Sequence, residues 1–215
     1  SLLMGADADL VRPVKKRAEA MFEAIRLKTK VLKMASDKKK IKVSMDIDGK
    51  KCDEAFDRVL VSVGRTPNSS DLGLENTGVQ LDDKGYIQVN DQQQTSDTKI
   101  FAIGDIAGGL LLAHKASKEA RVAVDTILGE PSTMDDVVVP AVVFTQPEVA
   151  WCGLTESEAK EQGIKVKVAK FSWAGSGRAL TLHQDAGLTK WIIDPETDRV
   201  FVRLVFVLNL HAVDG

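Results

Sequence analysis

The sequence of 215 residues is 44% hydrophobic and 28% charged, which is the balance of a globular protein and argues against extensive disorder. Its 29 basic and 31 acidic residues leave a net charge of −2, so no basic field favours binding to nucleic acid or to an anionic membrane. No apolar run approaches the roughly 20 residues of a membrane-spanning helix. Cys52 and Cys152 have no second cysteine nearby, which predicts structural thiols in a reducing compartment and no metal site.

The first half of the chain contains a predicted helix followed by a predicted hairpin. Apolar residues recur at helical spacing between Asp9 and Arg26, which predicts an amphipathic helix. Apolar and polar residues then alternate from Ile41 to Ile47 and meet Asp48-Gly49, so a β-hairpin with a tight turn is expected. The next stretch, FDRVLVSVG at residues 56–64, predicts a buried strand.

The middle of the chain is first polar and then regular. Residues 66–95 predict a connection, with one short strand at 85–89. The stretch KIFAIG at 99–104 predicts a further strand. A helix is expected over residues 113–127, closed by Gly129 and Pro131. Its predicted apolar face is formed by Ala113, Ala116, Ala120, Ala123, Val124 and Ile127.

The last third of the chain predicts an α+β domain. Strands are expected at 137–144, 165–171 and 187–194, with a helix at 155–162. Thr155 and Glu158 have the spacing of a capping box, and Gly163 stands at the expected helix C-terminus. The tryptophans are expected in the α+β core or its interface, and two histidines are expected to be structural. These residues are Trp151, Trp173, Trp191, His183 and His211.

Gly104 and Asp105 end a predicted strand, which is where open α/β sheets bind their ligands. A carboxylate there can accept hydrogen bonds from hydroxyl groups, and Gly104 lets a ligand approach the backbone. The helix that opens near His114 directs its positive N-terminal dipole toward the same place. A plain turn explains these two residues equally well. For His114 and Lys115, helix capping or packing is favoured over catalysis.

Three motifs favour a ligand site over a plain turn at Gly104 and Asp105, because they occur together in the order of a known protein family. VLVSVGRTPN at 59–68, TSDTKIFAIGDIAGG at 95–109 and LAHKASKEA at 112–120 resemble the flavin-dependent pyridine nucleotide-disulfide oxidoreductases. Within that family, VVFTQPEVAWCGLTESEAKEQG at 142–163 and FSWAGSGRAL at 171–180 resemble the dihydrolipoyl dehydrogenase branch. The glutathione, mercuric and transhydrogenase branches are the alternatives.

The resemblance implies α/β, Rossmann-like FAD- and NAD-binding segments followed by a truncated α+β dimerisation domain. The implied boundaries are 1–65 for the C-terminal part of the NAD-binding domain, 66–135 for the returning segment of the FAD-binding domain and 136–215 for the start of the dimerisation domain. Asp105, beside Gly104, matches the carboxylate that binds the ribityl chain of FAD, and Ala113 matches the backbone N–H that meets the flavin ring. The positions that match the NAD pocket are Val31, Ser62, Val63, Gly64 and Arg65. For these, simple strand termination is the competing interpretation.

The implied activity is oxidation of dihydrolipoamide by NAD⁺ through FAD and a redox disulfide. A homodimer is implied, associated with the lipoyl-bearing subunits of 2-oxoacid dehydrogenase complexes in the cytoplasm or mitochondrial matrix. The sequence has no GxGxxG fingerprint, no CxxxxC pair and no terminal His-Glu couple, so we expect an internal fragment that is inactive alone. The ending RVFVRLVFVLNLHAVDG departs from the family pattern and predicts an aggregation-prone strand. A non-catalytic dimerisation module is the rival from another class.

Overall fold

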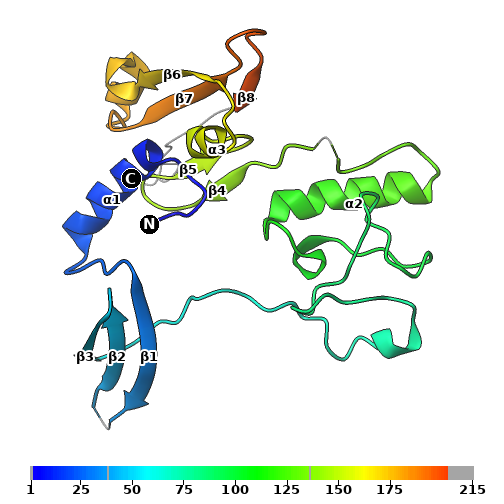
Figure 1. Ribbon diagram of the computed structural model, residues 1–215, viewed down its shortest axis with the longest axis horizontal. Coiled ribbons are helices and arrows are strands. Elements are labelled where there is room, and N and C mark those ends of the chain that lie inside the picture. Colours follow the sequence, from blue (N-terminus) through cyan, green and yellow to red (C-terminus); the bar gives the residue numbers. More distant parts are fainter. Residues whose placement is uncertain (1, 38, 136, 203–215) are drawn as a thin grey trace. The chain divides into compact units, whose positions relative to one another are not determined.

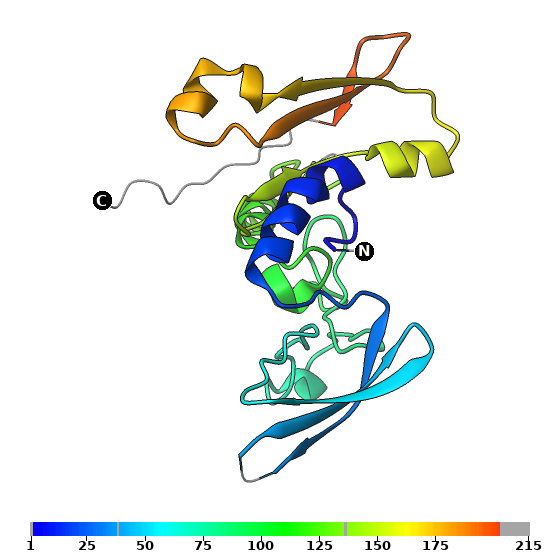
Figure 2. The same cartoon turned by 90° about the vertical axis from the view of Figure 1, so that its left-hand side faces the viewer.

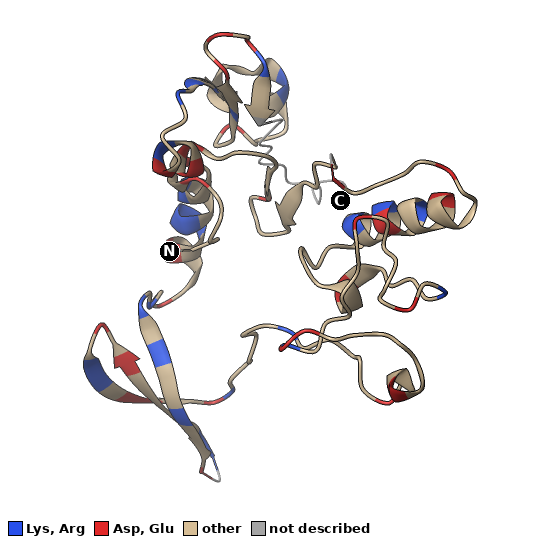
Figure 3. Ribbon diagram, turned by 45° about the vertical axis from the view of Figure 1, so that its right-hand side comes forward, with Lys and Arg blue, Asp and Glu red and all other residues tan. Residues whose placement is uncertain are grey.

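The computed structural model describes residues 2–37, 39–135 and 137–202 (Figure 1). The chain forms two compact units: unit 1 consists of Ser1–Ser62 and Val142–Gly215, and unit 2 of Val63–Ala141. Within the described residues, every helix is too short or too polar to cross a membrane. Lys and Arg residues are interspersed with Asp and Glu along the ribbon of each unit (Figure 3).

Unit 1 begins with helix α1, Ala8–Met21, which ends short of the predicted Arg26. Met21 and Phe22 are exposed, so the end of the apolar stripe has no packing to hold it helical. Leu10 and Val14, by contrast, are buried against Val149 in a small core.

The predicted hairpin is confirmed. Strands β1 (Thr29–Ser36), β2 (Ile41–Ile47) and β3 (Lys50–Phe56) form an antiparallel sheet, visibly twisted in Figure 2. Asp48 and Gly49 have φ of +50° and +87°, as a tight turn between β2 and β3 requires.

The predicted buried strand at residues 56–64 is wrong. β3 ends at Phe56, and residues 57–64 contain no strand. Leu60 is 93% exposed and Val63 is 92% exposed. A strand needs a neighbour for its backbone hydrogen bonds, and the described part of the chain pairs no strand with this segment.

Unit 2 contains the 3₁₀ helices η1 (Leu74–Asn76) and η2 (Gly104–Ala107) and helix α2 (Ala113–Ile127). The predicted strands at 85–89 and 99–104 reduce to isolated bridges, such as Leu81 with Ile87. Asp82 and Asn90 each stabilise a turn of the backbone. The side-chain Oδ1 of each residue accepts hydrogen bonds from two backbone N–H groups that follow it in the chain. Around these turns, the predicted strands at 85–89 and 99–104 are too short to pair over several residues.

Helix α2 has the predicted bounds, and Ala123 of the predicted apolar face is buried, but the rest of the buried face differs. Val124 and Ile127, expected inside, are 54% and 64% exposed. The buried residues are Lys115, Glu119, Val122 and Ala123. Two charged side chains therefore occupy the interior where alanines and aliphatic residues were predicted.

The α+β elements complete unit 1. β4 (Ala141–Val143) pairs with β5 (Val149–Trp151), and β6 (Lys167–Ser172), β7 (Leu188–Ile193) and β8 (Val200–Val202) form a sheet in that order. Helix α3 is Glu156–Glu161, and the predicted capping box of Thr155 and Glu158 is confirmed. η3 (Trp173–Gly175) and helix α4 (Gly177–Thr181) connect β6 to β7.

Two of the tryptophans differ in their surroundings. Trp151 packs against the small core as predicted. Trp191 is 42% exposed and so lies outside the core, and its alternative predicted place at an interface of the domain stays a prediction. The predicted aggregation-prone ending lies, beyond residue 202, outside the described residues.

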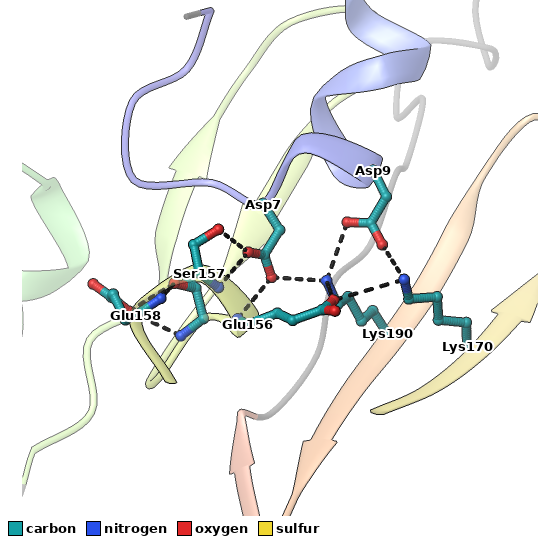
Figure 4. Close-up of polar contacts among 8 residues, drawn as sticks. Asp7, Asp9, Glu156, Ser157, Glu158, Lys170 and Lys190 are labelled. Atoms are coloured by element: carbon teal, nitrogen blue, oxygen red, sulfur yellow. Dashed lines mark hydrogen bonds and ion pairs between the residues drawn. The ribbon is translucent and has the colours of Figure 1, made fainter. Parts of the chain in front are cut away.

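Lys190 on β7 is a buried cation that joins this strand to α1 and α3 (Figure 4). Its Nζ lies 2.8 Å from Asp7 Oδ2, 3.2 Å from Asp9 Oδ1 and 2.6 Å from Glu156 Oε2. Lys170 on β6 adds a second cation, 2.7 Å from Asp9 Oδ2. Because burying a charge is costly unless partners surround it, these contacts hold the two helices to the sheet.

Asp7 also stabilises the N-terminus of α3. Its carboxylate accepts the backbone N–H of Glu156 at 3.0 Å and that of Ser157 at 3.1 Å. The hydroxyl of Ser157 donates to the same carboxylate at 3.0 Å. Asp7 is the N-cap residue of α1, yet its side chain makes no cap bond there. It therefore connects the start of one helix to the start of another.

We expect unit 1 to lose stability as the pH falls below 3.8, the ordinary pKa of Asp. Burial raises the pKa of Asp7, but the hydrogen bonds from Lys190, Glu156 and Ser157 bring it below its ordinary value. A carboxylate with a lowered folded pKa contributes stability above its unfolded pKa and loses it as pH falls through the folded pKa. Tryptophan-monitored melting should therefore show a shallower acid slope in Asp7→Asn than in the wild type. Equal slopes would contradict this explanation.

Candidate functional site

Unit 2 contains a pocket of ≈ 530 Å³ at the loop that leads into α2. Three parts of the sequence meet there: the segment 64–68, Tyr86 and the stretch that includes η2. The lining residues are Gly64, Arg65, Thr66, Pro67, Asn68, Tyr86, Asp105, Ile106 and Leu111. The pocket therefore combines two of the motifs that the sequence analysis singled out.

Asp105 lies in η2, and its Oδ2 accepts a hydrogen bond from Arg65 Nη1 at 2.8 Å. The two side chains are 52% and 66% exposed, so solvent screens the pair and it stabilises the fold little. A ligand in the pocket can reach the same carboxylate. The family resemblance implied that Arg65 lines the NAD pocket and that Asp105 binds FAD. In the structure the two side chains are in direct contact.

Gly104 precedes Asp105 and has a φ of +79°, a conformation that favours glycine. A Cβ atom at this position would lie 3.4 Å from Ala116 Cβ. The backbone N–H of Gly104 donates to Glu119 Oε2 at 2.7 Å. Gly104 thus lets η2 pack closely on α2, a role that neither ligand approach nor a plain turn, the two interpretations of the sequence, includes.

Helix α2 opens at Ala113 without side-chain capping. Its N-cap residue is Leu112, and the first turn contains no acidic residue. The N–H groups of a first turn have no partner within the helix and carry a partial positive charge. His114 Nε2 lies 2.7 Å from the carbonyl oxygen of Pro140, which fits the predicted packing role of His114. An electron-rich group of a ligand would be stabilised at this helix end.

The residues predicted to line an NAD pocket are divided between the two units, so this site stays a prediction. Val31 lies in β1 and Ser62 ends the first segment of unit 1, whereas Val63, Gly64 and Arg65 belong to unit 2. Of these five residues, Gly64 and Arg65 line the pocket described above.

The comparisons with known proteins give the family. The model of the pyridine nucleotide-disulphide oxidoreductases matches residues 2–120, and the model of their dimerisation domain matches residues 139–202. The chain belongs to the pyridine nucleotide-disulphide oxidoreductase family. The predicted family and fold class are thereby confirmed, with nucleotide-binding segments followed by an α+β dimerisation domain.

Similar proteins of this family come from several bacteria. The chain is 44% identical over 202 residues to a dihydrolipoyl dehydrogenase of Vibrio parahaemolyticus, covering 93% of this chain and 42% of that protein. It is 42% identical over 201 residues to a dihydrolipoyl dehydrogenase of Haemophilus influenzae, covering 93% of this chain and 41% of the relative. The chain thus spans about two-fifths of the length of these relatives.

Solved structures of the family have the same fold. LpdA of Mycobacterium tuberculosis matches with a TM-score of 0.83 and 27% identity, covering 94% of this chain and 43% of that one. The HOCl-induced flavoprotein disulfide reductase RclA of Escherichia coli matches with a TM-score of 0.83 and 26% identity, covering 96% and 47%.

Proposed function

We propose that this chain supplies the returning FAD-binding segment and dimerisation-domain residues of a dihydrolipoyl dehydrogenase. The observation that carries the proposal is the pocket of unit 2, where Asp105 and the approach to the uncapped N-terminus of α2 occur together. The similarity to two dihydrolipoyl dehydrogenases supports this branch of the family. We propose that residues 1–65 belong to the NAD-binding domain, residues 66–135 to the FAD-binding domain and residues 136–215 to the dimerisation domain.

The residues present fit FAD. Asp105 would accept hydrogen bonds from the ribityl hydroxyls, and the backbone N–H of Ala113 would meet the electron-rich edge of the flavin ring. Gly104 would keep the loop that carries Asp105 close to α2. FAD would supply the transfer of electrons between a dithiol and NAD⁺.

For the NAD-binding site we propose the residues Val31, Ser62, Val63, Gly64 and Arg65. In the whole enzyme we further propose a homodimer that serves lipoyl domains of a 2-oxoacid dehydrogenase complex in the cytoplasm.

Asp105→Asn is expected to weaken FAD binding by about 10–100-fold, because a hydrogen bond to a charged acceptor contributes about 1.5–3 kcal/mol. Equilibrium dialysis of the 215-residue chain against FAD measures the effect. Asp83→Asn is the matched control, since Asp83 is an exposed aspartate of unit 2 that does not line the pocket. Equal affinities of wild type and Asp105→Asn would contradict the proposed role.

The chain alone is expected to show no reduction of NAD⁺ by dihydrolipoamide, because its sequence has no CxxxxC pair to accept electrons from the thiols. Activity is tested in a chimera in which this chain replaces the matching segment of the Vibrio parahaemolyticus relative. Turnover with dihydrolipoamide, and none with glutathione disulfide, supports the proposed branch. Turnover by the chain alone, or a chimera that prefers another disulfide, contradicts it.

The match to a dimerisation domain at residues 139–202 favours a second candidate, a non-catalytic dimerisation module. Light scattering and FAD dialysis on the same sample separate the two. A dimer without flavin affinity supports the module, and flavin affinity that depends on Asp105 supports the flavoprotein.

A further inference from the structure

We propose that Lys115 and Glu119 are positioning residues of the flavin site, holding both ends of the loop that carries Asp105. This inference rests on the proposed function of that loop. Neither side chain is among the residues that line the pocket, so the pair acts through the backbone of the loop.

The two side chains form an ion pair inside unit 2. Lys115 Nζ lies 2.5 Å from Glu119 Oε1, and the side chains are 11% and 5% exposed. They stand one helical turn apart on α2, so a single rigid helix presents both. Opposite charges at this spacing neutralise each other, which makes their burial tolerable.

Each partner also binds one end of the loop. Glu119 Oε2 accepts the backbone N–H of Gly104 at 2.7 Å, and Lys115 Nζ donates to the carbonyl oxygen of Gly108 at 2.8 Å. Asp105 lies between these two anchors. The pair thus connects the start and the end of the loop to the same turn of α2.

Two backbone hydrogen bonds also hold the loop: the N–H of Gly108 donates to the carbonyl oxygen of Asp105 at 3.2 Å, and that of Ile87 donates to the carbonyl oxygen of Ile106 at 2.9 Å. Gly104, Gly108 and Gly109 all have positive φ, of +79°, +75° and +70°, and glycine gives the backbone wide freedom. The N-cap residue of η2 makes no side-chain bond. Gly109 also leaves room for the lysine, since a Cβ there would lie 3.3 Å from Lys115 Cε. The anchors on α2 therefore add to these backbone bonds in fixing the shape of the loop, and a binding carboxylate needs such support from its neighbours.

The test compares three variants of the 215-residue chain. Lys115→Met removes the anchor at Gly108 and leaves Glu119 charged. Lys115→Met with Glu119→Gln removes both charges but keeps an acceptor for the N–H of Gly104. Arg121→Met is the control, an exposed cation of the same helix. Equilibrium dialysis gives the affinity for FAD, and NMR gives the hydrogen exchange of the loop amides.

We expect the double variant to melt close to the wild type, to bind FAD at least tenfold more weakly and to exchange the Gly108 amide, which is bonded to the Asp105 carbonyl, at least tenfold faster. Arg121→Met should match the wild type in all three measurements. A double variant with wild-type FAD affinity would overturn the positioning role. If the wild type itself binds no FAD, the proposed function fails. Amide exchange still decides whether the pair holds the loop, and an unchanged exchange rate of the Gly108 amide would overturn that as well.

Discussion

Lys190→Met should lower the free energy of unfolding of unit 1 by about 3–5 kcal/mol, the cost of removing one partner from a buried ion pair. Without the ammonium, the carboxylates of Asp7, Asp9 and Glu156 face one another around a buried apolar side chain. Their mutual repulsion adds to the loss of the hydrogen bonds. Among the residues of β7, this substitution is expected to have the largest effect.

Urea denaturation followed by tryptophan fluorescence measures this loss. All three tryptophans, Trp151, Trp173 and Trp191, lie in unit 1, so the signal reports that unit. Lys167→Met on β6 is the control, because Lys167 is exposed and an exposed charge contributes little to stability. A loss of less than about 1 kcal/mol for Lys190→Met, in the range of a surface pair, would contradict the account.

Gly104→Val is expected to destabilise unit 2 by about 2–6 kcal/mol and to abolish measurable flavin binding. A β-branched residue at positive φ costs about 1–3 kcal/mol, and overpacking adds about 1–3 kcal/mol. The second contribution arises because a Cβ at Gly104 already lies 3.4 Å from Ala116 Cβ.

Gly129→Val separates the two contributions. Gly129 has the same φ of +79°, but nothing lies within 4 Å of a Cβ built there. It should therefore show the backbone cost alone, measured as the loss of hydrogen-exchange protection in α2. If both variants lose the same protection, the packing of η2 on α2 does not explain the glycine.

The parts of the fold that the sequence predicted well depend on local signals. Asp48-Gly49 specifies a turn whatever surrounds it, and Thr155 with Glu158 caps a helix through bonds within four residues. The strand predicted at 56–64 failed because pairing depends on a distant partner. Apolar periodicity alone cannot show which neighbours a segment has.

The candidate site shows the same division. Gly104 and Asp105 were found from their position after an apolar stretch and from the family motif. The contact of Asp105 with Arg65 spans 40 residues of sequence, so no local pattern could reveal it. Lys115 and Glu119 were missed as a buried pair because charged residues on a helix usually face solvent. Their spacing of four residues was the available signal.

An NMR titration of the ¹⁵N-labelled chain with FAD tests the central claim most directly. The claim is that unit 2 carries the flavin-binding segment at Asp105 and the start of α2. We expect the amides of Asp105 and Ala113 to shift progressively, and both responses to be lost in Asp105→Asn. Amides that stay unmoved at millimolar FAD, or shifts confined to unit 1, would contradict it.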